Sequence, residues 1–422
     1  MAYQSRLPSA TMMYPQELID EIIDYLHDSP SALKACALVS HRFYRRTRVH
    51  LFREVDCRTP DDPRSAQVFD IAHGSPELLQ CIKRVQFRCL DFFLPDHQTA
   101  TVEFLHSLPS PMTLSLWDDS YLAQYSVEEC EWRRILPAFV SLAPYLAITR
   151  LALEGPEWDT FLEFHHIVLS LPNVTELHII SCLKELSPDD DPVVPAPPAP
   201  RIKNIRVDVD WGTILSFWEG LRSYRSVYLD HLEEFHVINP SPDELCAVIQ
   251  TASLASKNLK VLEIDCRPLG GNYESLPPSI SPLDLNVITD LRLGVELSDD
   301  TPLFINWWIR SFKAVVENPP IMKRLTIKLR GYQSPVTESE PLERAFKELS
   351  DLLSKLVRNV DLVFQLNSYR SHPSLCTNHL KSEIVDACEV LKEKANLRVF
   401  DMAEYTYDVP VSPFPASTTR IV

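Results

Sequence analysis

A short alternating pattern recurs along most of this chain and constrains its fold more than any other feature. Each instance is an apolar residue, one variable residue and a second apolar residue, as in a strand with one buried face. First positions of successive instances are 26 to 40 residues apart, which is the interval of a repeat whose units bury their faces against one another. The instances are Val85-x-Phe87, Leu114-x-Leu116, Leu151-x-Leu153, Leu177-x-Ile179, Ile205-x-Val207, Phe235-x-Val237, Leu262-x-Ile264, Leu291-x-Leu293, Leu325-x-Ile327, Val360-x-Leu362 and Phe400-x-Met402.

Helical patterns separate several of these predicted strands. They cover residues 160–171, 242–254, 303–316, 341–356 and 380–394. Units of one strand and one helix would stack in parallel, with the strands along one wall and the helices along the other. An ordinary α/β domain with a parallel sheet would show the same alternation, and the spacing alone does not separate the two folds.

Two of the repeats resemble a known family in more detail. The segments Val174-x-x-Leu177-x-Ile179-x-x-Cys182 and Leu259-x-x-Leu262-x-Ile264 are partial fits to the L-x-x-L-x-L-x-x-N/C segment of leucine-rich repeats. Most other units lack the closing asparagine or cysteine. The resemblance implies an irregular leucine-rich-repeat-like solenoid of the α/β class, which we assign to residues 81–406.

The residues before the first predicted strand carry the pattern of three short helices. Pro15 lies where a helix begins, Pro30 follows a capping Ser29, and Ser40 can cap a third helix. So small a unit buries little apolar surface by itself, which indicates a binding partner. The first helix is amphipathic, and its apolar stripe consists of Leu18, Ile19, Ile22, Ile23 and Leu26.

Taken in order, these residues resemble the F-box. The matching positions are Tyr14-Pro15-x-Glu17-Leu18-Ile19-x-x-Ile22-Ile23-x-x-Leu26, then Leu33-x-x-Cys36-x-Leu38-Val39-Ser40-x-x-Phe43, then Leu51-Phe52. Tyr14 stands where leucine usually precedes the proline, and Phe43 stands where tryptophan is frequent. In that family the segment binds the Skp-family adaptor of a cullin-RING ubiquitin ligase, and the rest of the chain holds the protein to be ubiquitylated.

The resemblance therefore implies a substrate-recognition subunit of a Skp/cullin/F-box (SCF) ligase. Such a subunit has no catalytic residue and acts by proximity, presenting its target to a charged conjugating enzyme. Two alternatives remain: a non-catalytic interaction scaffold whose helical head only caps the solenoid, and an enzyme with a site in a long loop. The implied adaptor-binding residues are Tyr14, Pro15, Leu18, Ile19, Ile22, Ile23, Leu26, Leu33, Cys36, Leu38, Val39, Phe43, Leu51 and Phe52.

The residue between the two apolar positions of each strand projects from the opposite face. If the strands line a concave wall, these residues form a row that a target protein could touch. Their mixed charges, with no ladder of aromatic rings, favour a charged protein surface over single-stranded nucleic acid. The candidate target-binding residues are His178, Arg206, His236, Glu263, Arg292, Thr326 and Asp361.

Composition narrows the choice of partner and compartment. A net charge of -17 opposes binding to nucleic acid or to an anionic membrane surface. No apolar run reaches the eighteen or so residues that a membrane span needs. Ten cysteines occur without a C-x-x-C pair, which favours reduced thiols and hence the cytoplasm or nucleus.

Chemistry that depends on a metal or cofactor has little support in the sequence, and we expect neither. His372-x-x-x-Cys376-x-x-His379, followed by Cys388, comes nearest to a metal site but fits no zinc spacing well. His165-His166 is expected at the edge of a helix core. The predicted organisation is a disordered segment 1–10, an F-box-like domain 11–56, a connector 57–80, the repeat domain 81–406 with Pro-rich loops 187–200 and 267–282, and a tail 407–422.

Overall fold

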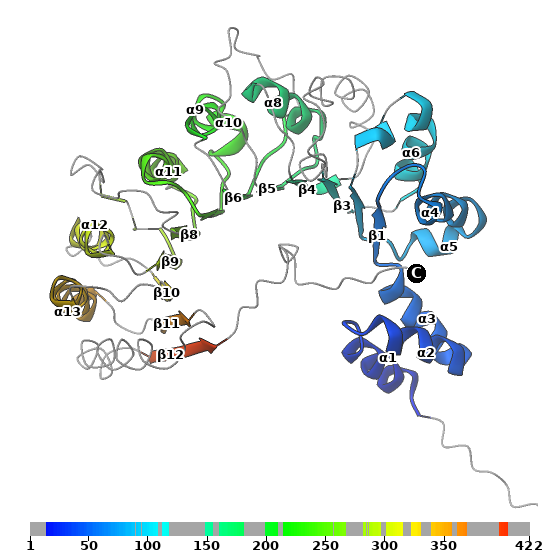
Figure 1. Cartoon of the computed structure of the whole chain (residues 1–422), viewed down its shortest axis with the longest axis horizontal. Coiled ribbons are helices and arrows are strands. Elements are labelled where there is room, and N and C mark those ends of the chain that lie inside the picture. The colour runs from blue at the N-terminus through cyan, green and yellow to red at the C-terminus, as the bar shows by residue number, and fades with distance from the viewer. Residues whose placement is uncertain are drawn as a thin grey trace, which may run out of the picture.

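A three-helix head precedes one long curved sheet in this protein (Figure 1). The structure is a computed structural model. It describes residues 14–88, 90–93, 95–108, 112–117, 148–154, 160–180, 199–209, 214–255, 257–266, 282–283, 285, 287–296, 301–314, 322–330, 339–356, 361–368 and 396–403.

The head consists of α1 (Gln16–Tyr25), α2 (Pro30–Val39) and α3 (His41–Leu51). All three helices begin where the sequence predicts. Pro15 occupies the N-cap of α1, and α2 has a proline at its first position. The side chain of Ser40 caps α3 by accepting a hydrogen bond from the Arg42 backbone N–H at 3.2 Å. Ser29 lies at the N-cap of α2, but its side chain makes no capping hydrogen bond.

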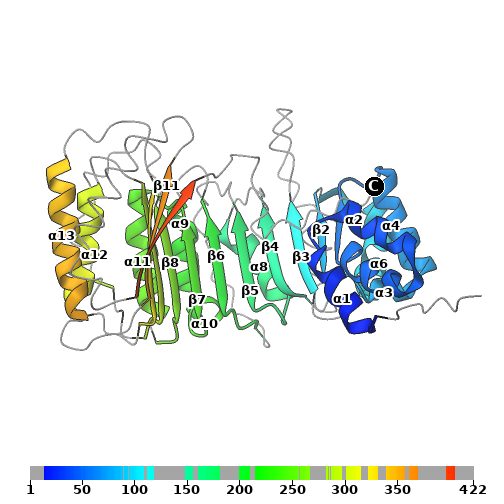
Figure 2. The ribbon, with the colours of Figure 1, turned by 90° about the horizontal axis from the view of Figure 1, so that it is seen from below.

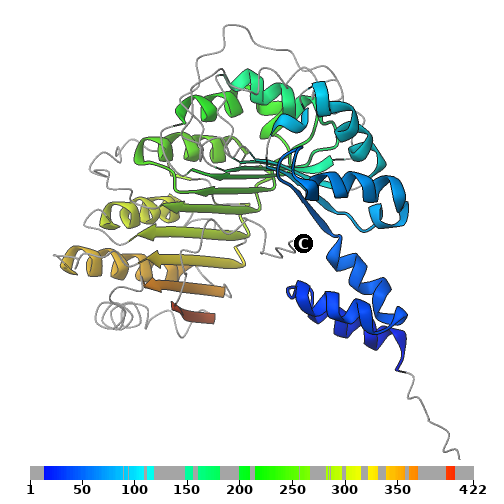
Figure 3. The ribbon, with the colours of Figure 1, turned by 45° about the vertical axis from the view of Figure 1, so that its right-hand side comes forward.

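The sheet contains twelve described strands, all parallel, and their order in space is their order in the sequence. Each strand pairs only with the one before and the one after it, so the sheet extends as a curved strip (Figures 1 and 3). This confirms the α/β class with a parallel sheet. The strands are β1 (Glu54–Cys57), β2 (Arg84–Phe87), β3 (Met112–Trp117), β4 (Ile148–Glu154), β5 (Glu176–Ile180), β6 (Asn204–Asp208), β7 (Glu234–Ile238), β8 (Val261–Cys266), β9 (Asp290–Glu296), β10 (Arg324–Arg330), β11 (Asp361–Ser368) and β12 (Asn396–Ala403).

Helices cover the outer side of the curve, and the strands line its inner side (Figures 1 and 2). The predicted helices at 160–171, 242–254, 303–316 and 341–356 are observed within two residues, whereas 380–394 lies outside the described residues. The predicted connector 57–80 contains two helices that sequence reasoning missed. The helices are α4 (Pro63–Gly74), α5 (Pro76–Leu79), η1 (Leu90–Phe93), α6 (Pro95–Ser107), α8 (Phe161–Ser170), α9 (Leu215–Ser223), α10 (Arg225–Tyr228), α11 (Pro242–Ala255), α12 (Thr301–Ala314) and α13 (Ser339–Leu356).

Nine of the eleven predicted apolar pairs lie in β2 to β10, with side chains no more than 5% exposed. The last two pairs are wrong. Leu325 of β10 pairs with Leu362, which pairs with Leu397, so the equivalent pairs are Leu362-x-Phe364 and Leu397-x-Val399. The predicted pairs lie two residues too early in β11 and three too late in β12. Both strands offer apolar residues in more than one phase, and only pairing with the neighbouring strand selects the register.

The first strand was also missed: β1 has four residues, and Val55 and Cys57 are its buried positions. It pairs with β2, so the sheet starts immediately after the head. Arg53, just before β1, accepts hydrogen bonds through its carbonyl from the backbone N–H groups of Lys83 and Arg84. The head is therefore joined to the sheet without an intervening linker.

A cluster of rings fills the layer between the sheet and the outer helices α8 to α10. Phe161 packs against the rings of Phe217 and Tyr224, at centroid distances of 5.8 and 5.7 Å. His165 is fully buried in this cluster, with Nδ1 2.9 Å from the Tyr228 hydroxyl. Burial lowers the pKa of His165 to about 4. It is a neutral core residue rather than part of a catalytic pair.

We predict that Gly220→Ala destabilises the protein. A Cβ at Gly220 in α9 would overlap the Phe161 ring, and that ring is held by the surrounding aromatic side chains. Overpacking of this kind costs about 1–3 kcal/mol. The higher helix propensity of alanine offsets about 1 kcal/mol of that cost. The urea midpoint should fall. Gly74→Ala in α4 is the matched control, because nothing lies within 4 Å of its added Cβ; an equal effect of both changes would contradict the packing argument.

Candidate functional site

The head exposes most of the large apolar side chains that are exposed in the described part of the chain. Of ten such residues, eight belong to the head, and the other two are Leu215 and Leu254. On α1, Leu18 is 47% and Ile22 56% exposed, and on α2 Leu38 is 89% exposed. We call these eight residues the exposed apolar set: Tyr14, Leu18, Ile22, Tyr25, Leu38, Val39, Tyr44 and Val49.

The apolar stripe of α1 is divided between two environments. Ile19 and Ile23 are buried, together with Leu33 of α2, so these three predicted adaptor-binding residues form the core of the head and are not available for contact. Leu18, Ile22 and Tyr25 follow at helical spacing on an exposed face. Among the remaining candidates, Tyr14, Pro15, Leu38 and Val39 are exposed, and Leu26, Cys36, Phe43, Leu51 and Phe52 are half-buried.

A charged clamp holds α1 against α3. The Asp24 carboxylate accepts hydrogen bonds from Arg46 Nε at 2.5 Å and Arg46 Nη2 at 2.7 Å, and it lies 2.7 Å from His50 Nε2. The hydrogen bond from Arg46 lowers the pKa of Asp24 to about 2. This clamp stabilises the packing of the head without using the exposed apolar set.

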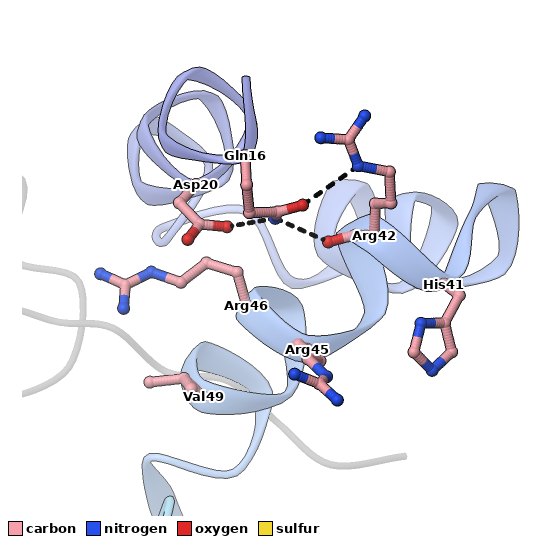
Figure 4. A pocket seen from close by; sticks show the side chains of 7 residues that line it. All are labelled: Gln16, Asp20, His41, Arg42, Arg45, Arg46 and Val49. Atoms are coloured by element: carbon pink, nitrogen blue, oxygen red, sulfur yellow. Dashed lines mark hydrogen bonds between the residues drawn. The ribbon is translucent and has the colours of Figure 1, made fainter. Parts of the chain in front are cut away.

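A hollow of about 500 Å³ opens between α1 and α3 (Figure 4). At its rim the Gln16 side chain donates to Asp20 Oδ1 at 2.8 Å and to the Arg42 carbonyl at 3.1 Å, and it accepts from Arg42 Nε at 3.2 Å. Arg45 and Val49 also line it. The head therefore presents a cationic side on α3 besides its apolar residues.

The second candidate surface is the inner side of the sheet. The residues between the apolar pairs are register partners from β2 to β10, which confirms the predicted row across these strands. We call it the central row: Gln86, Ser115, Ala152, His178, Arg206, His236, Glu263, Arg292 and Thr326. Asp361 is wrongly placed in that row, because it pairs with Arg324, whereas Thr326 pairs with Val363.

Burial divides the candidate target-binding residues further. His178 is 4%, Glu263 5% and Thr326 6% exposed, whereas Arg206, His236 and Arg292 are half-buried. Of the candidates in the row, Arg206, His236 and Arg292 are therefore the ones that a partner could reach.

An ionic network centred on Glu263 occupies the inner side of β7 to β10. Glu263 Oε2 lies 2.9 Å from His236 Nδ1 and 3.6 Å from Arg292 Nη1, and Lys328 Nζ donates to Oε1. Lys328 also lies 3.6 Å from Asp265. Burial alone would raise the pKa of Glu263, but the hydrogen bond from His236 and the Lys328 ammonium hold it well below its usual range. Sequence reasoning missed Lys328 and Asp265, since they lie two positions beyond the central row.

The described residues contain no candidate metal site. None of their His, Cys, Asp and Glu side chains form a group of three or more that could hold a metal ion. The segment from His372 to Cys388 lies outside the described residues. No helix in the described part of the chain is long and apolar enough to cross a membrane.

Comparison with known proteins adds little to this picture. No family model matches the chain, and no curated protein matches it. Among solved structures it is similar to the crystal structure of a Bacteroides fragilis protein determined as a structural-genomics target, with 12% sequence identity, a TM-score of 0.33, and coverage of 80% of this chain and 73% of that chain. At that TM-score the similarity establishes neither a common fold nor a function.

We predict that Glu263→Gln destabilises the folded protein at neutral pH by about 1–3 kcal/mol, because it leaves the half-buried Arg292 and Lys328 without their carboxylate. The folded pKa of Glu263 lies below the usual glutamate value of 4.5, so the stability that its carboxylate contributes is present above that pH and is lost as the pH falls. The difference between wild type and variant should shrink from about pH 6 to about pH 3. Urea midpoints across this range measure it.

Glu233→Gln serves as the control for this prediction. Its carboxylate also accepts from a lysine, Lys260, but it lies outside the central row and is a third exposed. Such a surface change is worth about 0.5 kcal/mol or less. A pH-independent effect of Glu263→Gln would show that the carboxylate acts by packing rather than by charge.

Proposed function

We propose that this chain is the substrate-recognition subunit of a Skp/cullin/F-box type ubiquitin ligase. In this proposal the head is an F-box-like domain that binds the Skp-family adaptor. The sheet and its outer helices are a leucine-rich-repeat-like solenoid that holds a target protein. The observation that carries the proposal is the exposed apolar set, combined with the order and spacing of the F-box-like residues.

Exposure of the apolar set is what separates a docking module from a structural cap. A cap would bury Leu18, Ile22 and Leu26 against its own chain, but the first two are about half exposed and Leu26 is half-buried. Monomeric proteins rarely leave so many apolar side chains exposed together in one small unit unless a partner covers them. This favours adaptor docking over the scaffold alternative.

An ion pair links the head to one of the helices that follow it. Arg48 Nη2 of α3 lies 3.2 Å from Glu77 Oε1 of α5. The exposed residues of α1 and α2 are therefore free to meet another protein while the head remains attached to β1. In the proposed function, this attachment sets the position of the solenoid relative to a bound adaptor.

The inner side of the sheet provides an extended recognition surface of mixed charge. Its residues are suited to contact a folded or extended protein partner, and the chain would act by holding that partner close to the ligase rather than by chemistry of its own. The described cysteines are free thiols, in keeping with the cytoplasm or nucleus, where we place the protein.

We expect wild-type chain to bind purified Skp-family adaptor and the double change Leu18→Asp/Ile22→Asp to weaken that binding about 100-fold or more, since a carboxylate in an apolar contact must be desolvated. Isothermal titration calorimetry measures both affinities. Because both side chains are exposed, circular dichroism and the melting temperature should change little.

Leu254→Asp on α11 is the matched control, since Leu254 is a similarly exposed leucine outside the head at 37%. It should leave adaptor binding unchanged. Absence of wild-type binding, or equal losses in the two variants, would contradict the proposed function and favour the scaffold.

A further inference from the structure

The inner side of the sheet is not uniform, and its part over β3 to β6 differs from the closed ionic network of β7 to β10. Ser115, Ala152, His178 and Arg206 are successive register partners there. Among them, Ser115 Oγ and Arg206 Nε are buried and have no hydrogen-bond partner among the described residues. Ser115 is only 6% exposed. A buried donor without an acceptor destabilises the folded protein. This stretch therefore has unused hydrogen-bonding capacity, whereas the carboxylate of Glu263 is fully engaged.

Charges of both signs surround these two donors: Arg84, Arg150 and Arg206 act on His178, which lies between them, and Glu154, Glu176 and Asp208 lie on the same face of β4 to β6. Burial, followed by the charges of Arg206 and Arg84, lowers the pKa of His178 to about 3, so it is neutral. Arg150 is paired with Glu176, and Arg84 lies 3.9 Å from Glu54. In the part of the chain that the structure describes, Arg206 takes part in no ion pair.

The spacing of these groups suits an extended segment rather than a small ion. Three strand spacings separate Ser115 from Arg206, or about 14 Å, which an extended chain covers in about four residues. An anion at Arg206 could form a charge-assisted pair of hydrogen bonds. A second acceptor on the same segment could accept a hydrogen bond from the Ser115 hydroxyl.

We propose that the inner side of β3 to β6, which we call the anion recess, receives an acidic stretch of the target protein, with a carboxylate or phosphate seated on Arg206. That this occupant is the target protein rests on the proposed function. Nucleic acid, the other polyanion, is disfavoured because it would bring many phosphates against a strongly acidic chain.

The test uses the full chain and three fluorescein-labelled peptides of glycine and alanine. The peptides differ only at two positions about four residues apart, a spacing matched to the span between Ser115 and Arg206. Both positions are serine in the first peptide, glutamate in the second and phosphoserine in the third. Fluorescence anisotropy measures each affinity. The wild type should bind at least one acidic peptide more tightly than the serine peptide, and Arg206→Gln should weaken that binding about tenfold. Preference for phosphoserine over glutamate identifies phosphate as the natural anion, and equal affinities identify carboxylate.

Lys203→Gln is the matched control, because it removes the same charge just before β6 from a side chain that is 55% exposed and faces Glu233. It should leave peptide affinity unchanged. Ser115→Ala, which preserves the size of the side chain, provides a second variant if Arg206→Gln proves unstable, and it should weaken binding about threefold.

Equal affinity for all three peptides, no binding to any of them, or equal losses with Arg206→Gln and Lys203→Gln would overturn the anion recess. Adaptor binding is measured separately through the head. Failure of the recess therefore leaves the adaptor result intact, and failure of adaptor binding leaves the peptide result intact.

Discussion

Stacking of the apolar pairs along the parallel sheet is the interaction on which the rest of this structure depends. A single strand and helix cannot bury its own apolar face, so each unit is stable only between its neighbours. Leu262, for example, pairs with Phe235 on one side and Leu291 on the other, and all three are fully buried. Because the same requirement applies at every unit, strand order follows sequence order. Helices on the outer side take more room than strands on the inner side, which gives the sheet its curve (Figure 1).

Charge on the inner side is a consequence of that stacking. Alternation along each strand places polar residues opposite the apolar pairs, and parallel register brings them into a continuous row. The charged groups in the two halves of the row are paired differently. Over β7 to β10, Glu263 draws His236, Arg292 and Lys328 into one network. Over β3 to β6 the central row holds no carboxylate, and Arg206 Nε is a buried donor without a hydrogen-bond partner among the described residues. The same architecture thus produces a self-satisfied surface beside one that is suited to a ligand.

The head differs from the sheet in how few of its apolar side chains are buried. It has only three short helices, so its core is small, and Ile19, Ile23 and Leu33 fill it. The Asp24 carboxylate, held by Arg46 and His50, adds a polar tie between α1 and α3. The exposed apolar set is not covered by any part of the described chain. A unit that is ordered but incompletely covered is the physical basis for proposing that it docks to another protein.

The sequence by itself determined the α/β class, the positions of nine strands and four helices, and the starts of the three head helices, because these depend on local periodicity and capping. It also named the central row from β2 to β10. Only the tertiary structure decided the register of β11 and β12, where several apolar phases compete, and the existence of β1, which pairs with β2. The division of the α1 stripe into buried Ile19 and exposed Leu18, and the meeting of Glu263 with Lys328, were likewise decided there. Both depend on which surfaces pack together over long separations in the chain, and local sequence patterns carry no information on that.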